Sequence, residues 1–489
     1  MNKINFLFLA VFLLFSQNNI SAQTKSAEET AKSPVAQRIN EWVQSVNTGD
    51  WAAMEKYAEA TYAGRYREYP TESHLQVMQD LYYKSRNLEI YEIKEASPHS
   101  ANATLKNKLT EGWIQLLMEV EPAAPHGIVR VGWGTADPPT EYKSNRSLTE
   151  IDLIRELDVY FTRLARADVY SGVVLLAKND RILYQKGFGE ANKNYSVANQ
   201  PDTKFNLASI PKMFTAVAVA QLVEAGKLSF EDSVHKFLPD LFPKETGQKI
   251  KIKHLLSHTS GLGNYLDKMS EAPRRRQPRL LPDYLEFVKG ETPAFEPGSG
   301  WRYSNSGFLI LGVIVEKLSD KSYFRYVREN IFEPAAMKDT GFFDAEWVIK
   351  NQAVGYEKQF TADSIRYKNN VLLIGGGNGS PAGGGYSIAA DLLKFFNALS
   401  AGKLLGAPLV KILQTAKPEL ASPDYGYGFF VNTNLNSAGH SGGFSGVSNN
   451  SATYFDTGYT LITLSNYGGA TELVQAKLDA LMLAVNKKR

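Results

Sequence analysis

Residues 209–226 read SIPKMFTAVAVAQLVEAG: a serine, a proline and a lysine lead into a long apolar segment. Proline fits an α-helix only in the first turn, where its missing N–H and fixed φ angle cost little. Pro211 therefore predicts a helix that begins beside Ser209. Gly226 predicts the end of that helix, since glycine is common just past the last turn. Lys212 follows Ser209 by three residues, so we expect both side chains on one face.

A serine and a lysine in this arrangement favour nucleophilic catalysis. A serine hydroxyl attacks poorly until a base removes its proton, and a lysine can be that base when burial or a nearby cation lowers its pKa. The helix N-terminus also stabilises the negative charge that develops during attack. The spacing by itself is common, and for an isolated motif an N-cap serine followed by a solvated lysine is the simpler interpretation.

Two later segments supply the partners that such a site needs. Residues 303–305 (Tyr-Ser-Asn) lie in a loop that leads into an apolar helix, and a tyrosine near a cation can relay a proton between nucleophile and leaving group. Residues 439–443 (GHSGG) precede the final strands, and their glycines let a strand edge approach a substrate with a backbone N–H free to bind an oxyanion. If each segment is considered alone, the alternative for 303–305 is an ordinary loop tyrosine and the alternative for 439–443 is an ordinary glycine-rich turn.

Taken in order, the three motifs resemble those of the penicillin-binding-protein and serine β-lactamase superfamily. The similar branch is the one nearest the class C enzymes, D,D-carboxypeptidases, D-aminopeptidases and related esterases. Ser-x-x-Lys is the first motif of the superfamily, and Tyr-x-Asn and His-x-Gly replace its Ser-Asp-Asn and Lys-Thr-Gly companions in this branch. Three further stretches are similar to the same family: HLLSHTSGLGNY from His254, PGSGWRYSNSGFLILG from Pro297 and AGGGYSIAADLLKF from Ala382. The resemblance covers about seven-tenths of the chain.

The resemblance implies a role for the residues that form and break bonds. Ser209 is expected to be the acylated nucleophile and Lys212 the base that deprotonates it. Tyr303 would pass a proton to the leaving group and help to activate the deacylating water. The backbone N–H groups of Ser209 and Gly443 would form the oxyanion hole. Pro211 departs from the family pattern, because a small polar residue is common there, and this departure affects the expected local geometry.

The remaining motif residues are expected to hold the substrate. Asn305 would bind the substrate backbone, together with Ser441 and Gly442 of the third motif. His440 would contact a substrate carboxylate or polarise the tyrosine, and it is counted with the catalytic residues.

Residues 150–489 are predicted to form one domain whose sheet draws strands from both ends of the chain. An amphipathic helix over 151–164 opens this domain, and helices dominate its middle. Asn179-Asp180 predicts a hairpin turn between the first two strands. With the family resemblance, this pattern implies a mixed α/β (α+β) fold class: a β-lactamase-like serine hydrolase domain with an antiparallel sheet flanked by helices. The strands are expected at residues 172–178, 181–187, 427–431, 451–455 and 459–465.

A smaller α+β domain is predicted ahead of it, over residues 34–134. Apolar residues recur at helical spacing from 34 to 85 and then alternate in strand fashion from 87 to 134. By this order of elements the domain looks like the cone-shaped nuclear transport factor 2-like fold. Residues 135–149 are rich in turn formers and are predicted to be a linker, and residues 23–33 a flexible leader.

The N-terminus has the layout of a secretory signal. Lys3 precedes the apolar run FLFLAVFLLF (6–15), and small residues follow at Ser21-Ala22. The run is shorter than the ~20 residues that a membrane-spanning helix needs, so we expect a signal peptide over 1–22, with an uncleaved anchor as the alternative. The chain has no cysteine, which excludes disulfides, thiol catalysis and a lipid anchor on an N-terminal cysteine. We therefore expect a bacterial periplasmic or secreted protein with no stable membrane anchor after cleavage.

Several other functions are disfavoured by the sequence. The net charge of +3 balances 54 basic against 51 acidic residues, which gives no reason to expect nucleic-acid binding. His254 and His258 have zinc-ligand spacing but lack the intervening glutamate of a metalloprotease, and the glycine-rich run 375–385 lacks the lysine of a P-loop. No metal or cofactor is expected.

The expected substrate is a small peptide, amide or ester. A lysine in the third motif would be a permanent cation suited to a carboxylate, whereas histidine is mostly neutral at pH 7. This favours a D-peptidase, amidase or esterase that forms an acyl-enzyme on Ser209. The alternatives are a β-lactamase and, from a different class, a catalytically inactive binding module. The N-terminal domain is a candidate ligand pocket or dimer interface.

Overall fold

The structure is a computed structural model that describes residues 33–139, 147–271, 280–344, 347–371 and 379–486. The predicted signal peptide and all but the last residue of the predicted leader lie outside the described residues, as do residues 140–146 of the predicted linker.

Helices and then strands make up the N-terminal region, as the periodicity predicts. Ser33 caps the first helix by accepting a hydrogen bond from Ala36 N, and Gly49 ends it with φ 65°. The helices lie against one face of a four-stranded antiparallel sheet of order β1-β2-β3-β4, around a core that includes Trp42 and Met78. The elements are α2 (Pro34–Thr48), α3 (Trp51–Thr61), η1 (Gly64–Glu68), α4 (Thr71–Ser85), β1 (Leu88–Ser97), β2 (Ser100–Asn107), β3 (Trp113–Val120) and β4 (Ile128–Ala136).

A six-stranded antiparallel sheet of order β13-β14-β15-β16-β5-β6 forms the centre of the C-terminal region. The first strand of this region pairs with the last, since Gly172 lies opposite Ser465 and Lys178 opposite Tyr459. The prediction that both ends of the chain build one sheet is therefore confirmed, and so is the hairpin at Asn179, where φ is 55°. The strands are β5 (Gly172–Lys178), β6 (Arg181–Phe188), β13 (Phe430–Asn432), β14 (Ser437–Phe444), β15 (Val447–Tyr454) and β16 (Tyr459–Ser465).

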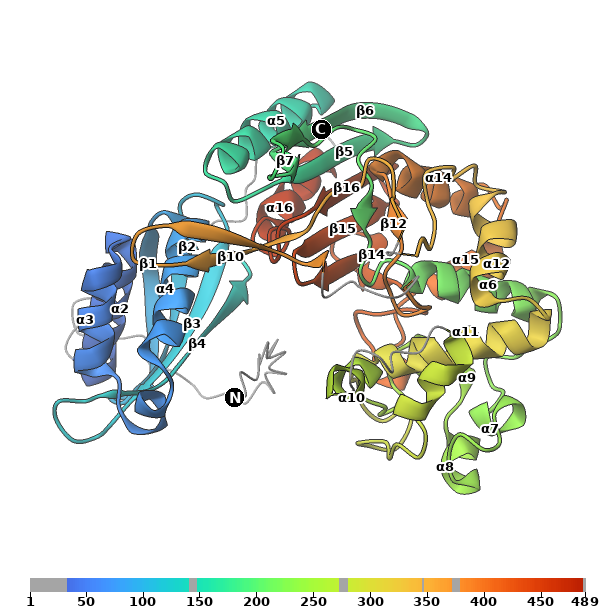
Figure 1. Ribbon diagram of the computed structural model, residues 1–489, viewed down its shortest axis with the longest axis horizontal. Coiled ribbons are helices and arrows are strands. Elements are labelled where there is room, and N and C mark those ends of the chain that lie inside the picture. Colours follow the sequence, from blue (N-terminus) through green and yellow to red (C-terminus); the bar gives the residue numbers. More distant parts are fainter. Residues whose placement is uncertain (1–32, 140–146, 272–279, 345–346, 372–378, 487–489) are drawn as a thin grey trace.

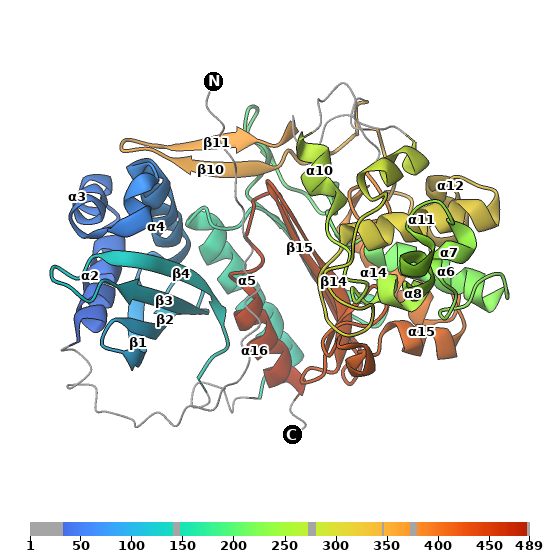
Figure 2. The same ribbon diagram turned by 90° about the horizontal axis from the view of Figure 1, so that it is seen from below.

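Helices cover both faces of this sheet, and β5 is buried on both. Val173 and Leu175 point into the core beneath α6 (Lys212–Glu224), α11 (Asn305–Ser319) and α14 (Ala389–Ser400). Val174 and Leu176 point into the core beneath α5 (Glu150–Arg166) and α16 (Gln475–Asn486). Figure 2 shows the sheet edge-on between these two groups of helices. Each such aliphatic side chain contributes about 1.5–3 kcal/mol by burial. The continuous apolar run of β5 is thus explained by a layer of helices on each side.

The helices of the C-terminal region are mostly short, apart from α5, α6, α11, α14 and α16. They are α5 (Glu150–Arg166), α6 (Lys212–Glu224), α7 (Val234–Phe237), α8 (Lys244–Lys249), α9 (Ile252–Leu256), α10 (Tyr265–Glu271), η4 (Leu281–Phe287), α11 (Asn305–Ser319), α12 (Tyr323–Val327), the π-helical turn η5 (Arg328–Phe332), α14 (Ala389–Ser400), α15 (Ala407–Leu413), η6 (Pro418–Leu420) and α16 (Gln475–Asn486).

The sequence analysis did not predict a long hairpin formed by β10 (Tyr356–Phe360) and β11 (Ile365–Asn369). Figures 1 and 2 show it reaching from the C-terminal region to helix α4 of the N-terminal region. Short strand pairs complete the fold: β7 (Glu190–Asn192) with β8 (Val197–Ala198), and β9 (Phe205–Asn206) with β12 (Tyr386–Ser387).

Two strand predictions near the C-terminus differ from the structure. The strand expected over 427–431 is only β13, Phe430–Asn432, because Gly428 adopts φ 79° and turns the chain. The glycine-rich run 439–443 is itself part of strand β14, which pairs with β13 on one side and β15 on the other.

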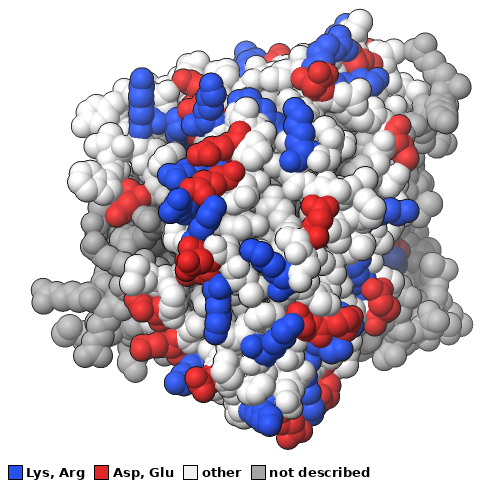
Figure 3. Space-filling model, turned by 90° about the vertical axis from the view of Figure 1, so that its right-hand side faces the viewer, with Lys and Arg blue, Asp and Glu red and all other residues white. Residues whose placement is uncertain are grey.

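The surface matches the balanced composition. Figure 3 shows one face on which Lys and Arg side chains lie among Asp and Glu side chains, and neither sign forms a continuous field there. Among the described residues, no helix combines the length and apolar character needed to cross a bilayer.

Candidate active site

Ser209 lies in the turn that immediately precedes α6, as Pro211 predicts. Lys212 N donates to Ser209 O at 3.1 Å, so the chain enters the helix through a tight turn. The residue before the serine, Ala208, adopts φ 47°, which is uncommon for a residue with a side chain. This backbone is held because Ala208 N donates to Asn206 Oδ1 at 2.9 Å and Ala208 O accepts from Gly384 N at 2.7 Å.

Lys212 is fully buried at the start of α6, and its ammonium nitrogen has three partners. Nζ lies 3.1 Å from Ser209 Oγ and 2.7 Å from Asn305 Oδ1, and it also donates to the carbonyl oxygen of Ala382. It lies 4.9 Å from the centre of the Tyr303 ring. The structure therefore brings together the first two sequence motifs around one lysine (Figures 1 and 2 show α6 beside α11).

These contacts bear on the protonation state of the lysine. Burial lowers the pKa of Lys212 well below its usual range. A neutral amine has two N–H donors and one lone pair. The oxygens of Asn305 and Ala382 can only accept, so they take both hydrogens, and the lone pair faces Ser209 Oγ. The site can therefore hold a lysine that is ready to take the serine proton.

The second motif is fixed at the N-terminus of α11. Ser304 caps this helix by accepting from Gly307 N at 3.0 Å, which orients the residues on either side of it. Asn305 Nδ2 donates to Asn264 Oδ1 at 3.0 Å, so the amide oxygen of Asn305 is the atom turned toward Lys212. Asn305, predicted to bind the substrate backbone, is thus placed as a partner of the lysine.

Tyr303 is half-buried beside the serine and the lysine. Burial raises the pKa of its phenol above the usual value, and a hydrogen bond with Ser209 partly offsets this rise. The phenol is therefore protonated at pH 7 before substrate binds, and it can donate a proton.

The third motif lies on β14, and His440 is buried there. Its Nε2 lies 2.9 Å from Tyr425 Oη and its Nδ1 2.5 Å from Ser441 O, while its ring centre is 6.5 Å from that of Tyr303. Burial is the main cause that lowers its pKa to about 3, so the imidazole is neutral at pH 7. Both ring nitrogens of His440 thus have protein partners, Tyr425 and the Ser441 carbonyl, and the roles predicted for the histidine stay predictions.

A glycine of β14 allows close contact with the turn that carries Ser209. A methyl group at Gly442 would overlap the carbonyl oxygen of Leu207 and lie 3.2 Å from Ser209 N. The neighbours Ser441 and Gly443 are exposed on the same strand. Gly442 therefore lies directly beside the turn that holds Ser209, and Ser441 and Gly443 are its neighbours on β14.

Sequence reasoning missed several residues that shape this site. His258 accepts from Ser304 N at 3.0 Å through Nδ1, and its ring centre is 4.2 Å from that of Tyr303. It lies in the quoted HTSG stretch, so a signal was present. Tyr425 had no such signal, because its contact with His440 is made only by the folded chain.

The zinc alternative has no support from the geometry. His254 Nδ1 accepts from Lys251 N and His258 Nδ1 from Ser304 N. Within the ranges that the structure describes, no three His, Cys, Asp or Glu side chains are grouped so as to hold a metal ion.

Comparisons with known proteins agree with this fold and site. The model of the beta-lactamase family matches residues 158–486. Penicillin-binding protein 4* of Bacillus subtilis (strain 168) is 32% identical over 349 residues, which are 67% of this chain and 74% of that protein. The crystal structure of a penicillin binding protein from Bacillus halodurans superposes with a TM-score of 0.57 at 29% identity, over 65% of this chain and 98% of that one. D-amino acid amidase from Ochrobactrum anthropi SV3 shares the fold, with a TM-score of 0.56 at 24% identity over 68% and 97% of the two chains.

Ser209 lies beside a buried lysine at the start of a helix that packs against an antiparallel sheet. With the family match, this arrangement defines the class of the protein, which is a serine hydrolase. More particularly, the chain belongs to the beta-lactamase family.

Proposed function

We propose that the protein is an exported serine hydrolase that forms an acyl-enzyme on Ser209 and acts as a D-peptidase, amidase or esterase. One observation carries the proposal: the buried Lys212 Nζ lies 3.1 Å from Ser209 Oγ, and its other two partners, Asn305 Oδ1 and Ala382 O, are oxygens that can only accept hydrogen bonds.

Acylation would begin with transfer of the Ser209 hydroxyl proton to Lys212 Nζ as Oγ attacks the substrate carbonyl. The oxyanion of the tetrahedral intermediate would accept hydrogen bonds from the N–H groups of Ser209 and Gly443. When the intermediate collapses, the bond to the leaving amine or alcohol breaks. The leaving group takes the proton from Lys212 through the Tyr303 hydroxyl, which restores the neutral lysine.

Deacylation would use the same groups in reverse. Water gives a proton through Tyr303 to Lys212 and attacks the ester that joins the acyl group to Ser209. The Ser209 oxygen then leaves and takes back the proton, so the enzyme returns to its starting state with the acid released. The position of Tyr303, hydrogen-bonded to the serine with its ring centre 4.9 Å from the lysine nitrogen, supports this relay.

The uncharged imidazole of His440 in the third motif supports the proposed substrate class. His440 is buried and uncharged at pH 7, so it offers no permanent cation for a carboxylate. D-peptides, D-amino-acid amides and simple esters do not need that cation, and one structural neighbour is a D-amino acid amidase. A β-lactam or a terminal D-alanine carboxylate would bind better to a lysine in this position.

We propose two domains, residues 34–134 and 150–489, and export through the signal peptide over residues 1–22. The separate apolar core of the N-terminal region supports the division. N-terminal sequencing of protein recovered from the periplasm or the medium tests the export step, and a chain that keeps residue 1 in the cytoplasm would contradict it.

The central test is intact mass after incubation with a fluorophosphonate probe, with wild type and Ser209→Ala compared side by side. We expect one adduct on the wild type and none on the variant. Turnover of ester, D-peptide amide and β-lactam panels then ranks the substrates. An unlabelled wild type would overturn the proposal and favour a binding module, and β-lactams as the best substrates would overturn the proposed substrate class.

A further inference from the structure

The β10–β11 hairpin connects the N-terminal region to the catalytic sheet. At its outer end, Phe360 is 3% exposed and stacks on Tyr83 of α4 with ring centres 4.8 Å apart and planes at 13°. Gln76, also on α4, accepts from Phe360 N at 2.9 Å and donates to Phe360 O. Helix α4 therefore holds the outer end of the hairpin, although Gln76 and Phe360 are 284 residues apart in the sequence.

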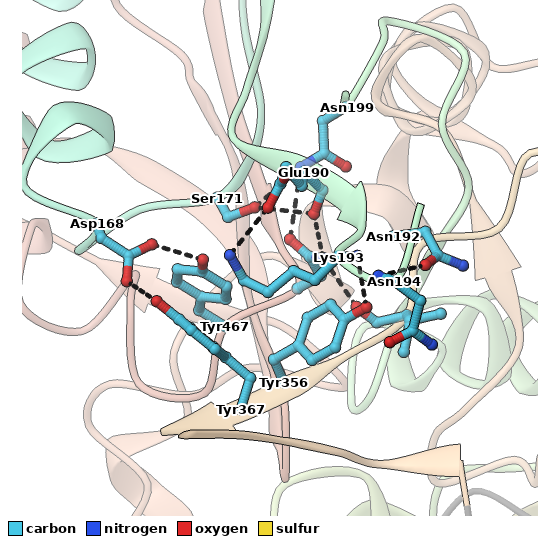
Figure 4. Close-up of polar contacts among 12 residues, drawn as sticks. Asp168, Ser171, Glu190, Asn192, Lys193, Asn194, Asn199, Tyr356, Tyr367 and Tyr467 are labelled. Carbon is cyan, nitrogen blue, oxygen red and sulfur yellow. Dashed lines mark hydrogen bonds and ion pairs between the residues drawn. The ribbon is translucent and has the colours of Figure 1, made fainter. Parts of the chain in front are cut away.

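The hairpin is also fixed to the C-terminal region near its base. Figure 4 shows Asp168 receiving hydrogen bonds from Tyr367 of β11 and Tyr467, the latter at 2.6 Å, and Lys358 of β10 forms an ion pair with the same carboxylate at 3.0 Å. Tyr356 Oη accepts from Lys193 N at 2.8 Å. A change at the outer end can therefore be transmitted along the strands to their base.

At the base, the hairpin holds the turn that ends strand β14. Glu357 accepts from Gly446 N at 2.6 Å, and Asn370 Nδ2 donates to Ser445 O at 2.8 Å. The backbones touch here, since a methyl group at Gly446 would lie 2.6 Å from Tyr356 N. Because the two backbones lie this close and both side chains bind the turn, the turn has little freedom to shift without the hairpin.

This turn begins beside the predicted oxyanion donor. Gly443 lies opposite Ser448 in the β14–β15 ladder, and residues 445 and 446 form the turn between these two positions. Oxyanion donors act only when they are held close to the position that the charged oxygen will occupy. The placement of Gly443 N–H thus depends on contacts made by the hairpin.

We propose that Glu357 is a positioning residue for the oxyanion hole, and that the N-terminal region supports catalysis through the β10–β11 hairpin. The inference rests on the proposed function, because it assigns the purpose of the contact to the hydrolytic site. Glu357 acts through the β14–β15 turn, and the grip of α4 on Phe360 keeps the hairpin in the orientation that presents Glu357 to Gly446.

The first experiment compares Glu357→Ala, which removes the acceptor, with Glu357→Gln, which keeps an oxygen there. Active sites are titrated with the fluorophosphonate, and kcat and KM for an ester are calculated per titrated site. We expect Glu357→Ala to lower kcat about tenfold, less than the 10²–10³ caused by complete loss of an oxyanion donor, with KM little changed. Glu357→Gln should recover most of kcat. Gln359→Ala, at an exposed position on the same strand, is the matched control.

The second experiment tests the connection to the N-terminal region with Phe360→Ala in the full chain. We expect lower kcat per titrated site and faster backbone hydrogen exchange in the β14–β15 turn, with no further loss of kcat when Phe360→Ala is added to Glu357→Ala. The inference would be overturned if Phe360→Ala lowered kcat equally in the wild-type and Glu357→Ala chains, or if hydrogen exchange in the turn stayed at the wild-type rate. Labelling of Ser209 would still support the proposed function in that case. An unlabelled wild type would overturn the proposed function, and the exchange measurement would still decide whether the hairpin holds the turn.

Discussion

At the scale of single residues, the proposed mechanism needs Lys212 in its neutral form, which burial favours by lowering the pKa of Lys212. Lys212 is buried among two carbonyl acceptors and the Ser209 hydroxyl. We expect Lys212→Met to lower kcat and the rate of fluorophosphonate labelling by about 10²–10⁴-fold, as for loss of a general base. Arginine stays charged and cannot take the proton, so Lys212→Arg should be equally impaired. Labelling of either variant at the wild-type rate would exclude Lys212 as the base.

Lys212 determines how kcat/KM depends on pH, and His440 determines how KM for a carboxylate-bearing substrate depends on pH. Because the neutral amine is the active form, kcat/KM should fall as the pH drops through the lowered pKa of Lys212. His440 stays neutral down to a pKa of about 3, so KM for a carboxylate-bearing substrate should be flat from pH 5 to 8. Steady-state kinetics across this range provide the check. A KM that rises as the pH passes 6 to 7 would show that an imidazolium binds the carboxylate.

At the scale of elements, β14 must lie against the nucleophile turn with no side chain between them. Gly442→Ala would place a methyl group into the Leu207 carbonyl, so we expect β14 to move away from Ser209. The expected result is a loss of kcat of at least about 10²-fold together with a lower Tm. Gly132→Ala on β4 is the control, because no atom lies within 4 Å of a methyl group there. Kinetics and thermal unfolding of both variants test the contact, and wild-type kcat in Gly442→Ala would contradict it.

Elements with strong local signals could be predicted from the sequence, and those stabilised by distant contacts could not. Pro211 and Gly226 bracket α6 as expected, and Asn179 turns the β5–β6 hairpin. The β10–β11 hairpin is rich in polar residues and gave no strand signal, since its support comes from Tyr83 far along the chain. Within the site, the three motifs predicted that Ser209 and Lys212 lie together. The hydrogen bond between His440 and Tyr425 could not be predicted, because it forms only in the folded sheet.

At the scale of the whole molecule, buried neutral histidines make stability depend on pH. The pKa of His440 is lowered from 6.5 to about 3, so between these values the unfolded chain binds a proton that the folded chain does not. This contribution is complete above pH 6.5 and is lost as the pH falls toward 3. We expect His440→Gln to reduce the slope of unfolding free energy against pH by about 1.4 kcal/mol per unit between pH 4.5 and 6.

Urea unfolding at several pH values measures this slope. Above pH 7 the histidine is neutral in both states, so the two proteins should show the same slope there. Equal slopes between pH 4.5 and 6 would mean that His440 is accessible to protons in the folded state.

The pairing of β5 with β16 has a consequence for how the chain is made. Strand partners such as Val173 and Leu464 are almost 300 residues apart in the sequence, and contacts of such high sequence separation slow folding. During translation, Ser209 and Lys212 emerge long before residues 447–465, which complete the sheet against which their helix packs. The ribosome must therefore release nearly the entire polypeptide before Ser209 and Lys212 can pack against the completed sheet. A nascent or truncated chain should be inert.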